Sequence, residues 1–396
     1  MGTLICPLIE SIEILYRVYY GEWWKMEYRE LGKTGLKTSL LGFGGFHLLE
    51  IPVREAGALL NAYLDAGGNY IETAASYGNG ESERKIGASA IGRRDEFVLV
   101  TKVGDREKEA AAAKIDRSLK NLRTDHVDLL LLHGMESVGA LNRSLAEDGA
   151  YQAALEAKKA GKALHVGISM HGQPAPLLAA LETGKFEAVM STINYYDRCN
   201  FPEIERDLLP LAREKGAGVI LMKPIADGYL YRSAERAFRY AFSRPVSVVV
   251  AGINSRQMLD MDLRFAEEYA PMAAEEEREL LMDAPELGNY VCRQCGGCAG
   301  ACGKGIDIME VFASEAYYDR QMMRGAVADT AQYALSERLK FWFGQKQQGI
   351  DRYARISPNA DACDACGACA PSCPYGVDIP YKMHLAGYKL CAKEIY

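Results

Sequence analysis

Eight cysteines stand in two runs with the same spacing, and these runs are the strongest chemical signal in the chain. The first run holds Cys292, Cys295, Cys298 and Cys302, and the second holds Cys363, Cys366, Cys369 and Cys373. The spacing C-x2-C-x2-C-x3-C is that of a [4Fe–4S] site. Three closely spaced thiolates ligate one cubane, and the fourth either completes it or ligates a neighbouring one. The sequence therefore predicts two [4Fe–4S] clusters.

The alternative for these cysteines is a zinc ribbon, which usually pairs two C-x2-C hooks or adds histidine and needs no third closely spaced thiol. Pro374 follows the second run, as is common in cluster loops, whereas Gly303 follows the first. Because the runs match, we expect them to be paired. Cys302 and Cys373 would then each ligate the cluster held mainly by the other run.

A second group of reactive residues follows short apolar runs earlier in the chain. Glu72, Lys102 and His133 each end such a run, and Tyr77 follows shortly after Glu72. A tyrosine can protonate a carbonyl if a lysine ammonium lowers its pKa, and a carboxylate can hold that lysine charged. A neutral imidazole can orient the carbonyl oxygen. These four residue types together are suited to proton transfer at a carbonyl.

The elements that would position these residues are short apolar runs separated by amphipathic stretches. Runs this short and rich in Val, Ile and Leu indicate buried parallel strands in βαβ units. Eight units before residue 275 predict a (β/α)8 TIM barrel, in which strand C-terminal ends carry the chemistry. The alternative is an open doubly wound sheet. The predicted strands are Leu40–Phe43, Asn69–Glu72, Phe97–Lys102, Val127–His133, Ala163–Ser169, Ala188–Asn194, Val219–Lys223 and Ser247–Gly252, with helices at Glu107–Leu122, Tyr151–Ala160 and Pro202–Lys215.

Several segments resemble the aldo/keto reductases, a (β/α)8 family that transfers hydride between a nicotinamide and a carbonyl. They are Tyr28–Leu36, Thr73–Gly78 with Glu81–Glu83, Val100–Lys102 and Asp128–His133. The resemblance implies that Tyr77 is the general acid, Lys102 tunes its pKa and His133 orients the carbonyl. The family usually has Asp where this chain has Glu72. With both cysteine runs, the chain resembles the branch of the family fused to a C-terminal ferredoxin-type domain.

The resemblance also implies a cofactor site, but this chain departs from the usual pattern there. Ser169 matches the family, whereas Met170, Met190 and Met222 replace polar or aromatic residues that hold the nicotinamide. Methionine can pack on a ring but cannot donate an amide-type hydrogen bond. The phosphate end would be Gly252, Asn254 and Ser255, at the start of a helix. Family members that use NADPH often have a basic residue where Asn254 stands, so NADH is favoured.

The remaining segments divide the chain into three parts. Residues 1–25 are a leader too charged and short to span a bilayer and without signal-peptide features. Residues 26–284 form the barrel, and residues 285–396 form the iron–sulfur domain, with helices at Ile308–Gly325 and Ala328–Phe343. The net charge of -7 disfavours nucleic acid as a partner. His47 and His171 are interpreted as loop or packing residues.

These features together predict a cytoplasmic iron–sulfur oxidoreductase that reduces a carbonyl or oxidises an alcohol with NAD(P)H. Its clusters would exchange electrons with a redox partner such as a ferredoxin, and it would bind neither nucleic acid nor membrane. The alternative is a barrel without catalytic activity, acting as an electron-transfer or scaffold subunit with structural clusters. The substituted cofactor positions favour this alternative.

Overall fold

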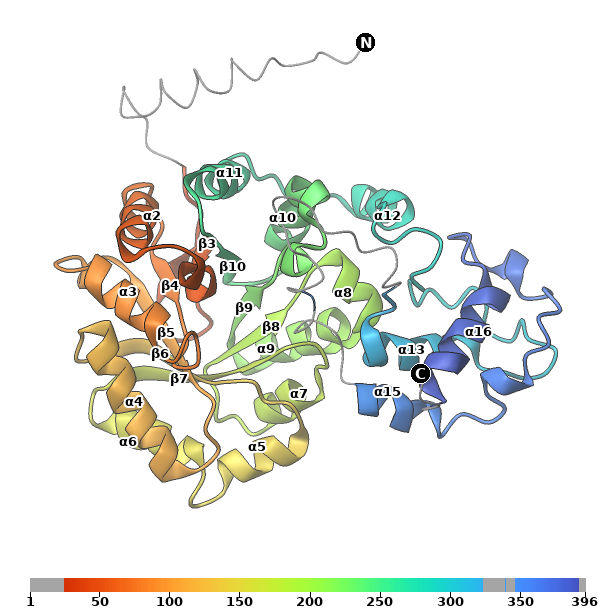
Figure 1. Ribbon diagram of the computed structural model, residues 1–396, viewed down its shortest axis with the longest axis horizontal. Helices are drawn as coiled ribbons and strands as arrows, with labels where there is room; N and C mark the ends of the chain where they lie inside the picture. The colour runs from red at the N-terminus through yellow and green to blue at the C-terminus, as the bar shows by residue number, and fades with distance from the viewer. Residues whose placement is uncertain (1–24, 323–338, 340–345, 392–396) are drawn as a thin grey trace, which may run out of the picture.

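The computed structural model describes residues 25–322, 339 and 346–391 (Figure 1). The predicted leader, apart from Lys25, lies outside the described residues. The predicted helix Ala328–Phe343 also does, apart from Leu339. Within the described ranges, no helix is both long and apolar enough to cross a lipid bilayer.

Eight parallel strands close into a barrel in the order β10-β3-β4-β5-β6-β7-β8-β9. Each agrees with a predicted strand to within two residues at either end, so the (β/α)8 barrel is confirmed and the open sheet is wrong. The strands are β3 (Leu41–Gly44), β4 (Tyr70–Glu72), β5 (Val98–Val103), β6 (Val127–Leu132), β7 (Ala163–Met170), β8 (Ala188–Thr192), β9 (Gly218–Met222) and β10 (Val248–Gly252).

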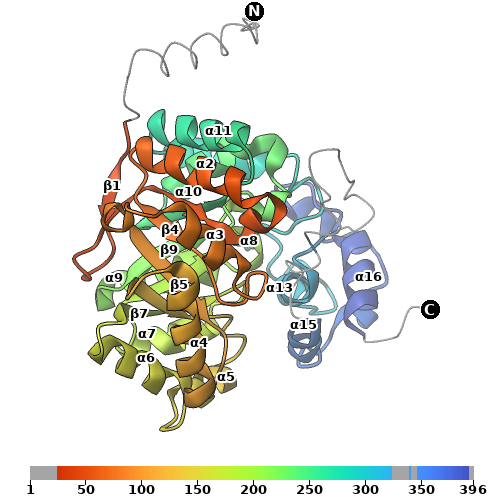
Figure 2. The same ribbon diagram turned by 60° about the vertical axis from the view of Figure 1, so that its left-hand side comes forward.

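Helices surround this barrel on its outer side (Figures 1 and 2). They are α2 (Val53–Asp65), α3 (Glu81–Ser89), α4 (Lys108–Leu122), α5 (Val138–Leu145), α6 (Ala150–Lys159), α7 (Ala175–Glu182), α8 (Tyr195–Asn200), α9 (Leu209–Lys215), α10 (Ala234–Phe242), α11 (Arg256–Glu267) and α12 (Ala274–Asp283). A π-helix, Ile204–Leu208, precedes α9, so the predicted helix Pro202–Lys215 is divided in two.

Side chains alternate between the two faces of each strand, as a β-strand requires. In β5, Val98 and Val100 pack in the barrel interior, while Leu99 and Val103 pack against the helices. The same alternation directs Lys102, the next even position, towards the barrel axis. The period of two therefore places the reactive residues on the inner face.

A hairpin closes the N-terminal end of the barrel, and the sequence reading did not predict it. Strands β1 (Tyr28–Glu30) and β2 (Lys37–Ser39) pair antiparallel, and Leu31 packs into the barrel interior between them. Gly32 has φ +57, and a Cβ there would lie 2.3 Å from the Gly218 nitrogen. Only glycine fits this close approach.

The C-terminal module is an internal repeat in which each cysteine run leads into a helix. Helix α13 (Ile308–Asp319) follows the first run, α16 (Ile379–Leu390) follows the second, and α15 (Lys346–Tyr353) packs on α13. Asp307 and Asp378 cap the two helices by accepting hydrogen bonds from the amides of Glu310 and Tyr381. Corresponding positions of the repeat are 71 residues apart. Both views place α13 beside α8 of the barrel (Figures 1 and 2).

Candidate active site and cluster-binding cysteines

Four side chains with predicted catalytic roles meet at the C-terminal end of the barrel. Glu72 ends β4, Lys102 lies near the end of β5, Tyr77 is in the loop after β4, and His133 directly follows β6. Lys102 and Glu72 form a buried ion pair, with side chains 1% and 4% exposed. The Lys102 Nζ also donates to the Tyr77 Oη over 3.1 Å and to the Thr73 carbonyl over 2.9 Å. The ammonium is thus held between a carboxylate and a phenol.

Burial and the Glu72 charge decide the protonation of this group. Burial lowers the pKa of Lys102, but Glu72 and Tyr77 outweigh it and the pKa is raised. The pKa of Tyr77 is also raised, because burial and the Glu72 carboxylate together outweigh the Lys102 ammonium. Lys102 acts to lower the pKa of Tyr77, as expected. The net change is nevertheless a rise, so the predicted lowering of the Tyr77 pKa was wrong. Tyr77 therefore keeps its proton at neutral pH.

His133 lies beside Tyr77 and remains neutral. The two rings are 6.0 Å apart, with planes at 81°. The His133 Nδ1 is 3.5 Å from the Ser76 hydroxyl. Burial lowers the pKa of His133 to about 3, and the Lys102 and Arg106 charges act in the same direction. A neutral imidazole beside the phenol can donate a hydrogen bond to a substrate oxygen.

Two further side chains border this group: Phe46, which the sequence analysis did not single out, and His171, which it interpreted as a loop or packing residue. The Phe46 ring is 48% exposed and meets the Tyr77 ring edge-on at 5.1 Å. The His171 ring is 6.4 Å from that of His133. Burial and the nearby Lys223 charge hold the pKa of His171 well below its usual range. The interpretation of His171 as a loop residue was incomplete; its position directly after β7 was the available signal.

The residues expected to hold the nicotinamide lie on neighbouring strands. Ser169 is buried at the end of β7, and its hydroxyl donates to the Leu132 carbonyl over 3.4 Å. Met190 and Met222 pack in the barrel interior. Met170 instead packs on the outer side among the helices. Met170 therefore lies outside the barrel interior, unlike Met190 and Met222.

The residues expected at the phosphate end lie together between β10 and α11. The Ser255 hydroxyl caps α11 by accepting from the Met258 amide over 3.2 Å. Asn254 donates to the Glu50 carboxylate, which also contacts His47 Nδ1 at 3.0 Å. His47 packs so closely on Gly252 that a Cβ there would lie 2.1 Å from its ring. The acidic Glu50 at this end was not foreseen.

The cysteines of the two runs interleave. Cys292, Cys295 and Cys298 line one small cavity together with Cys373 of the second run. Burial raises the pKa of Cys369, and Cys363, Cys302 and Cys366 act on it in the same direction, so these four thiols are neighbours. Cys302 and Cys373 each lie with three cysteines of the other run, and their ligation of that run's cluster stays a prediction. We call the first of these groups the first cluster site and the second the second cluster site.

Backbone amides donate hydrogen bonds to two of the sulfurs at the first cluster site. Within the described ranges, no three His, Cys, Asp or Glu side chains are grouped as they would be around one metal ion. The four thiols instead line a cavity wall. The amides of Gln294 and Val377 donate to the sulfurs of Cys292 and Cys373, both over 3.4 Å. Such hydrogen bonds stabilise cluster thiolates.

The two loops also share an unusual backbone. Gln294 and Ala365 occupy the position before the second cysteine of each run, with φ of 54 and 58. Gly296 and Gly367, directly after that cysteine, have φ of 83 and 77. Two left-handed residues around one cysteine turn the chain tightly enough for the three thiols to converge.

Two side chains directly after α13 connect the barrel to the first cluster site. The Arg320 Nε lies 3.1 Å from the Asp197 carboxylate of α8, and both side chains are buried. The Gln321 amide donates to the Asn200 carbonyl oxygen over 3.0 Å and accepts from the Cys292 amide over 2.7 Å. Arg320 and Gln321 have positive φ, 58 and 55. Residues held in this strained region are common at functional sites.

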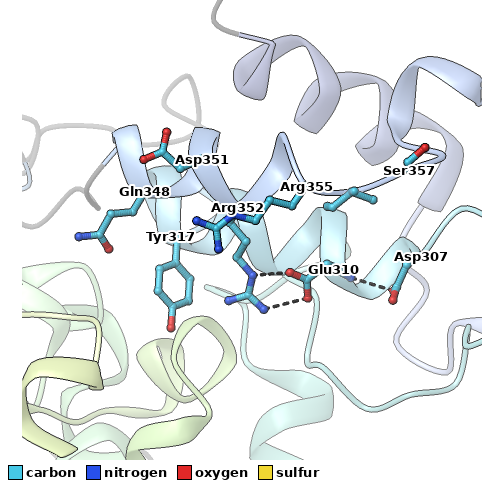
Figure 3. A pocket seen from close by; sticks show the side chains of 9 residues that line it. Asp307, Glu310, Tyr317, Gln348, Asp351, Arg352, Arg355 and Ser357 are labelled. Atoms are coloured by element: carbon cyan, nitrogen blue, oxygen red, sulfur yellow. Dashed lines mark hydrogen bonds and ion pairs between the residues drawn. The ribbon is translucent and has the colours of Figure 1, made fainter. Parts of the chain in front are cut away.

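A separate cavity of about 660 Å³ lies in the C-terminal module, between α13 and α15 (Figure 3). Arg352 pairs with both oxygens of Glu310 at 2.6 and 2.9 Å across it. Tyr317 lines one side, and Asp307 is on the Glu310 side. Its central charges are already paired, so it plays no part in the chemistry considered below.

Comparison with known proteins identifies both parts of the chain. A model of the aldo/keto reductase family matches residues 40–249, more than half of the chain. The chain belongs to the aldo/keto reductase family. A model of a 4Fe-4S dicluster domain matches residues 291–377. The protein is therefore an oxidoreductase that joins an aldo/keto reductase barrel to a ferredoxin-type domain.

Its relatives match the barrel. An L-galactose dehydrogenase of Arabidopsis thaliana is 34% identical over 224 residues, covering 52% of this chain and 67% of that protein. A probable voltage-gated potassium channel subunit beta of Oryza sativa subsp. japonica is 27% identical over 266 residues, covering 63% and 79%. The solved aldo-keto reductase AKR11C1 from Bacillus halodurans, in its holo form, has a TM-score of 0.57 at 26% identity, covering 64% and 95%.

Proposed function

We propose that the barrel transfers hydride between a nicotinamide cofactor and a small carbonyl compound, with Tyr77 as the proton donor. The observation that carries this proposal is the Lys102 ammonium, which is paired with Glu72 and donates to the Tyr77 hydroxyl over 3.1 Å. Tyr77 is protonated at rest because its pKa is raised. A protonated phenol is the form needed to reduce a carbonyl, so reduction is the favoured direction.

The other residues of the site have separate roles in this proton transfer. As the phenol gives up its proton, negative charge develops on its oxygen, and Lys102 stabilises that charge. Glu72 keeps Lys102 charged in a buried position. The neutral His133 donates a hydrogen bond to the carbonyl oxygen and directs it to Tyr77. Phe46, at the rim, shields the site from water.

The cofactor site supports NADH. When bound, the nicotinamide supplies hydride, and Ser169 and Met222 border the position its ring would take. Gly252, Asn254 and Ser255 would receive the phosphates at the start of α11. The Glu50 carboxylate beside Asn254 would repel the additional phosphate of NADPH and could accept a hydrogen bond from a ribose hydroxyl.

We also propose that the module holds two [4Fe–4S] clusters that exchange single electrons with a carrier protein such as a ferredoxin. The grouping of the eight cysteines into two sets of four supports this content. Cys295 and Cys366 are exposed, so each cluster site has an edge that a partner can approach. The protein would then work in a reducing cytoplasm.

Replacement of the proposed acid tests the catalytic role. Tyr77→Phe should reduce turnover of a reactive 1,2-dicarbonyl with NADH by roughly 100-fold or more, as expected for loss of a general acid. Tyr151→Phe is the matched control, because the Tyr151 hydroxyl only donates to the Lys185 carbonyl on the outer side of the barrel. Equal turnover of Tyr77→Phe and the control would remove Tyr77 from the mechanism.

Cofactor and iron measurements separate this proposal from a barrel that serves only as an electron-transfer or scaffold subunit. Anaerobically purified protein should contain about eight irons per chain. It should bind NADH more tightly than NADPH in a fluorescence titration. The interior packing of Met190 and Met222 is the observation that favours the scaffold. Intact clusters without binding of either nucleotide would support it.

A further inference from the structure

A buried group of charges lies on one side of the C-terminal module. Lys382 of α16 and Glu315 of α13 pair at 2.6 Å, with side chains 1% and 0% exposed. Lys389 contacts the other oxygen of Glu315 at 2.6 Å and Asp319 at 2.8 Å. Burying so many charges is costly, even when they are paired. Their position therefore calls for an explanation beyond stability.

The buried Lys382 lies directly behind the first cluster site. Its Nζ is 3.8 Å from the centre of the Tyr290 ring and 4.9 Å from that of Phe312. Phe312 lines the cavity formed by the four cysteines. The lysine thus acts on the first cluster site through a low-dielectric layer.

The internal repeat shows that the second cluster site lacks such a lysine. Lys382 is 71 residues after Val311, the same separation as between Cys292 and Cys363. Val311 is fully buried and packs in the module core, which Cys363 borders. By the same offset, Ala386 corresponds to Glu315. The two otherwise similar loops therefore differ in the buried Lys382–Glu315 pair and in Arg293, which lines the first site and corresponds to Asp364 in the second.

We propose that Lys382 raises the reduction potential of the first cluster above that of the second. Reduction adds one electron to an already negative cluster, and a nearby buried cation stabilises the reduced form. The second site has Lys304 nearby, but this side chain is 45% exposed and paired with Asp364 at 2.9 Å. Water screens such a charge. The inference rests on the two-cluster content proposed above.

A difference in reduction potential means that an electron shared by the two clusters is distributed unequally between them. At equilibrium one electron resides mainly on the first cluster and leaves the second oxidised, with no proton transferred. The first site is the one joined to the barrel, through Gln321 and Asn200. Electrons accepted at the exposed Cys366 edge from a one-electron carrier would therefore collect beside the barrel.

A redox titration followed by electron paramagnetic resonance tests this assignment in the full-length, iron-loaded protein. Lys382→Met should make reduction of the first cluster at least tenfold less favourable, which is 59 mV for a one-electron couple. Lys304→Met is the matched control at the second cluster and should change reduction less than twofold. A shift below twofold in Lys382→Met, with iron content and both signals intact, refutes the inference without affecting the two-cluster proposal.

A second measurement keeps the test decisive if Lys382→Met fails to fold. Cys295→Ser replaces an exposed ligand of the first cluster and should alter the signal that appears at the higher potential. Cys366→Ser is the corresponding change in the second cluster and should alter the signal at the lower potential. The reverse assignment overturns the inference. Fewer than about eight irons in the unaltered protein would instead refute the two-cluster content.

Discussion

Removal of the Glu72 charge should make the Tyr77–Lys102 pair a stronger acid. Glu72 is ion-paired with Lys102, which in turn donates to Tyr77, so the nearest carboxylate oxygen lies within about 5 Å of the phenol oxygen. At an effective dielectric constant of about 20, two charges at that distance interact by about 3 kcal/mol. This corresponds to roughly two pKa units. Glu72→Gln should therefore lower the pKa at which the pair loses its first proton by about two units.

Two assays can detect this shift. The high-pH limb of kcat/KM for carbonyl reduction, where Tyr77 loses its proton, should move down by about two pH units. The ultraviolet absorbance of the tyrosine anion, taken as a difference against Tyr77→Phe, follows the same proton without turnover. Because Lys102 and Tyr77 titrate as a coupled pair, the measured value belongs to both.

Glu72→Asp is the control for this prediction, because it keeps the charge and is the residue usual in the family. The high-pH limb of kcat/KM for Glu72→Asp should lie within about half a pH unit of the limb for the unaltered protein, because the interaction energy between the carboxylate and the phenol changes little. A Glu72→Gln limb at the original pH would show that burial alone raises the pKa of Tyr77. The carboxylate would then have no electrostatic role in the site.

Other changes test separate parts of the molecule. Burial raises the pKa of Asp262 well above its usual value, so ionisation of this carboxyl destabilises the folded state. The destabilisation is absent below about pH 4, where the carboxyl is protonated in both the folded and the unfolded chain, and it grows as the pH rises. Asp262→Asn should raise the melting temperature at pH 7.5 and much less at pH 4.5. Asp197→Asn should cost about 3–5 kcal/mol of unfolding free energy by removing the carboxylate charge paired with the buried Arg320, and further change of Arg320 to Met should restore most of it. His133, with a pKa of about 3, should add no limb to the pH profile of kcat/KM between pH 5 and 8, and a limb near 6.5 would contradict its neutral state. Cys373→Ser should remove the signal of the cluster held by the first run, although Cys373 belongs to the second.

Periodic and closely spaced features could be predicted from the sequence. The apolar runs gave the barrel strands, because a strand buried on both faces is continuously apolar. The spacing of the cysteines predicted the paired sites, because local loop geometry alone brings three thiols together. Lys102 and Glu72 were predicted to meet because adjacent parallel strands end at the same edge.

Features that depend on tertiary contact could not be predicted in this way. The hairpin of β1 and β2 has few apolar residues, and its role becomes visible only when Leu31 enters the barrel interior. Arg320 is far from α8 in the sequence, so its pairing with Asp197 had no local signal. The net pKa shift of Tyr77 depends on the depth of burial, which a spacing pattern does not contain.

If Cys302 and Cys373 each ligate the cluster held mainly by the other run, as proposed, each cluster is a cross-link between distant parts of the chain. A bridge from Cys292 to Cys373 closes a loop of about eighty residues, and closing such a loop restricts the unfolded chain by on the order of 4 kcal/mol. Loss of iron would release both cross-links at once. Exposure to oxygen should therefore unfold the module and free Arg320 and Gln321 from the barrel, so that oxidative damage at the clusters reaches the carbonyl site through loss of structure.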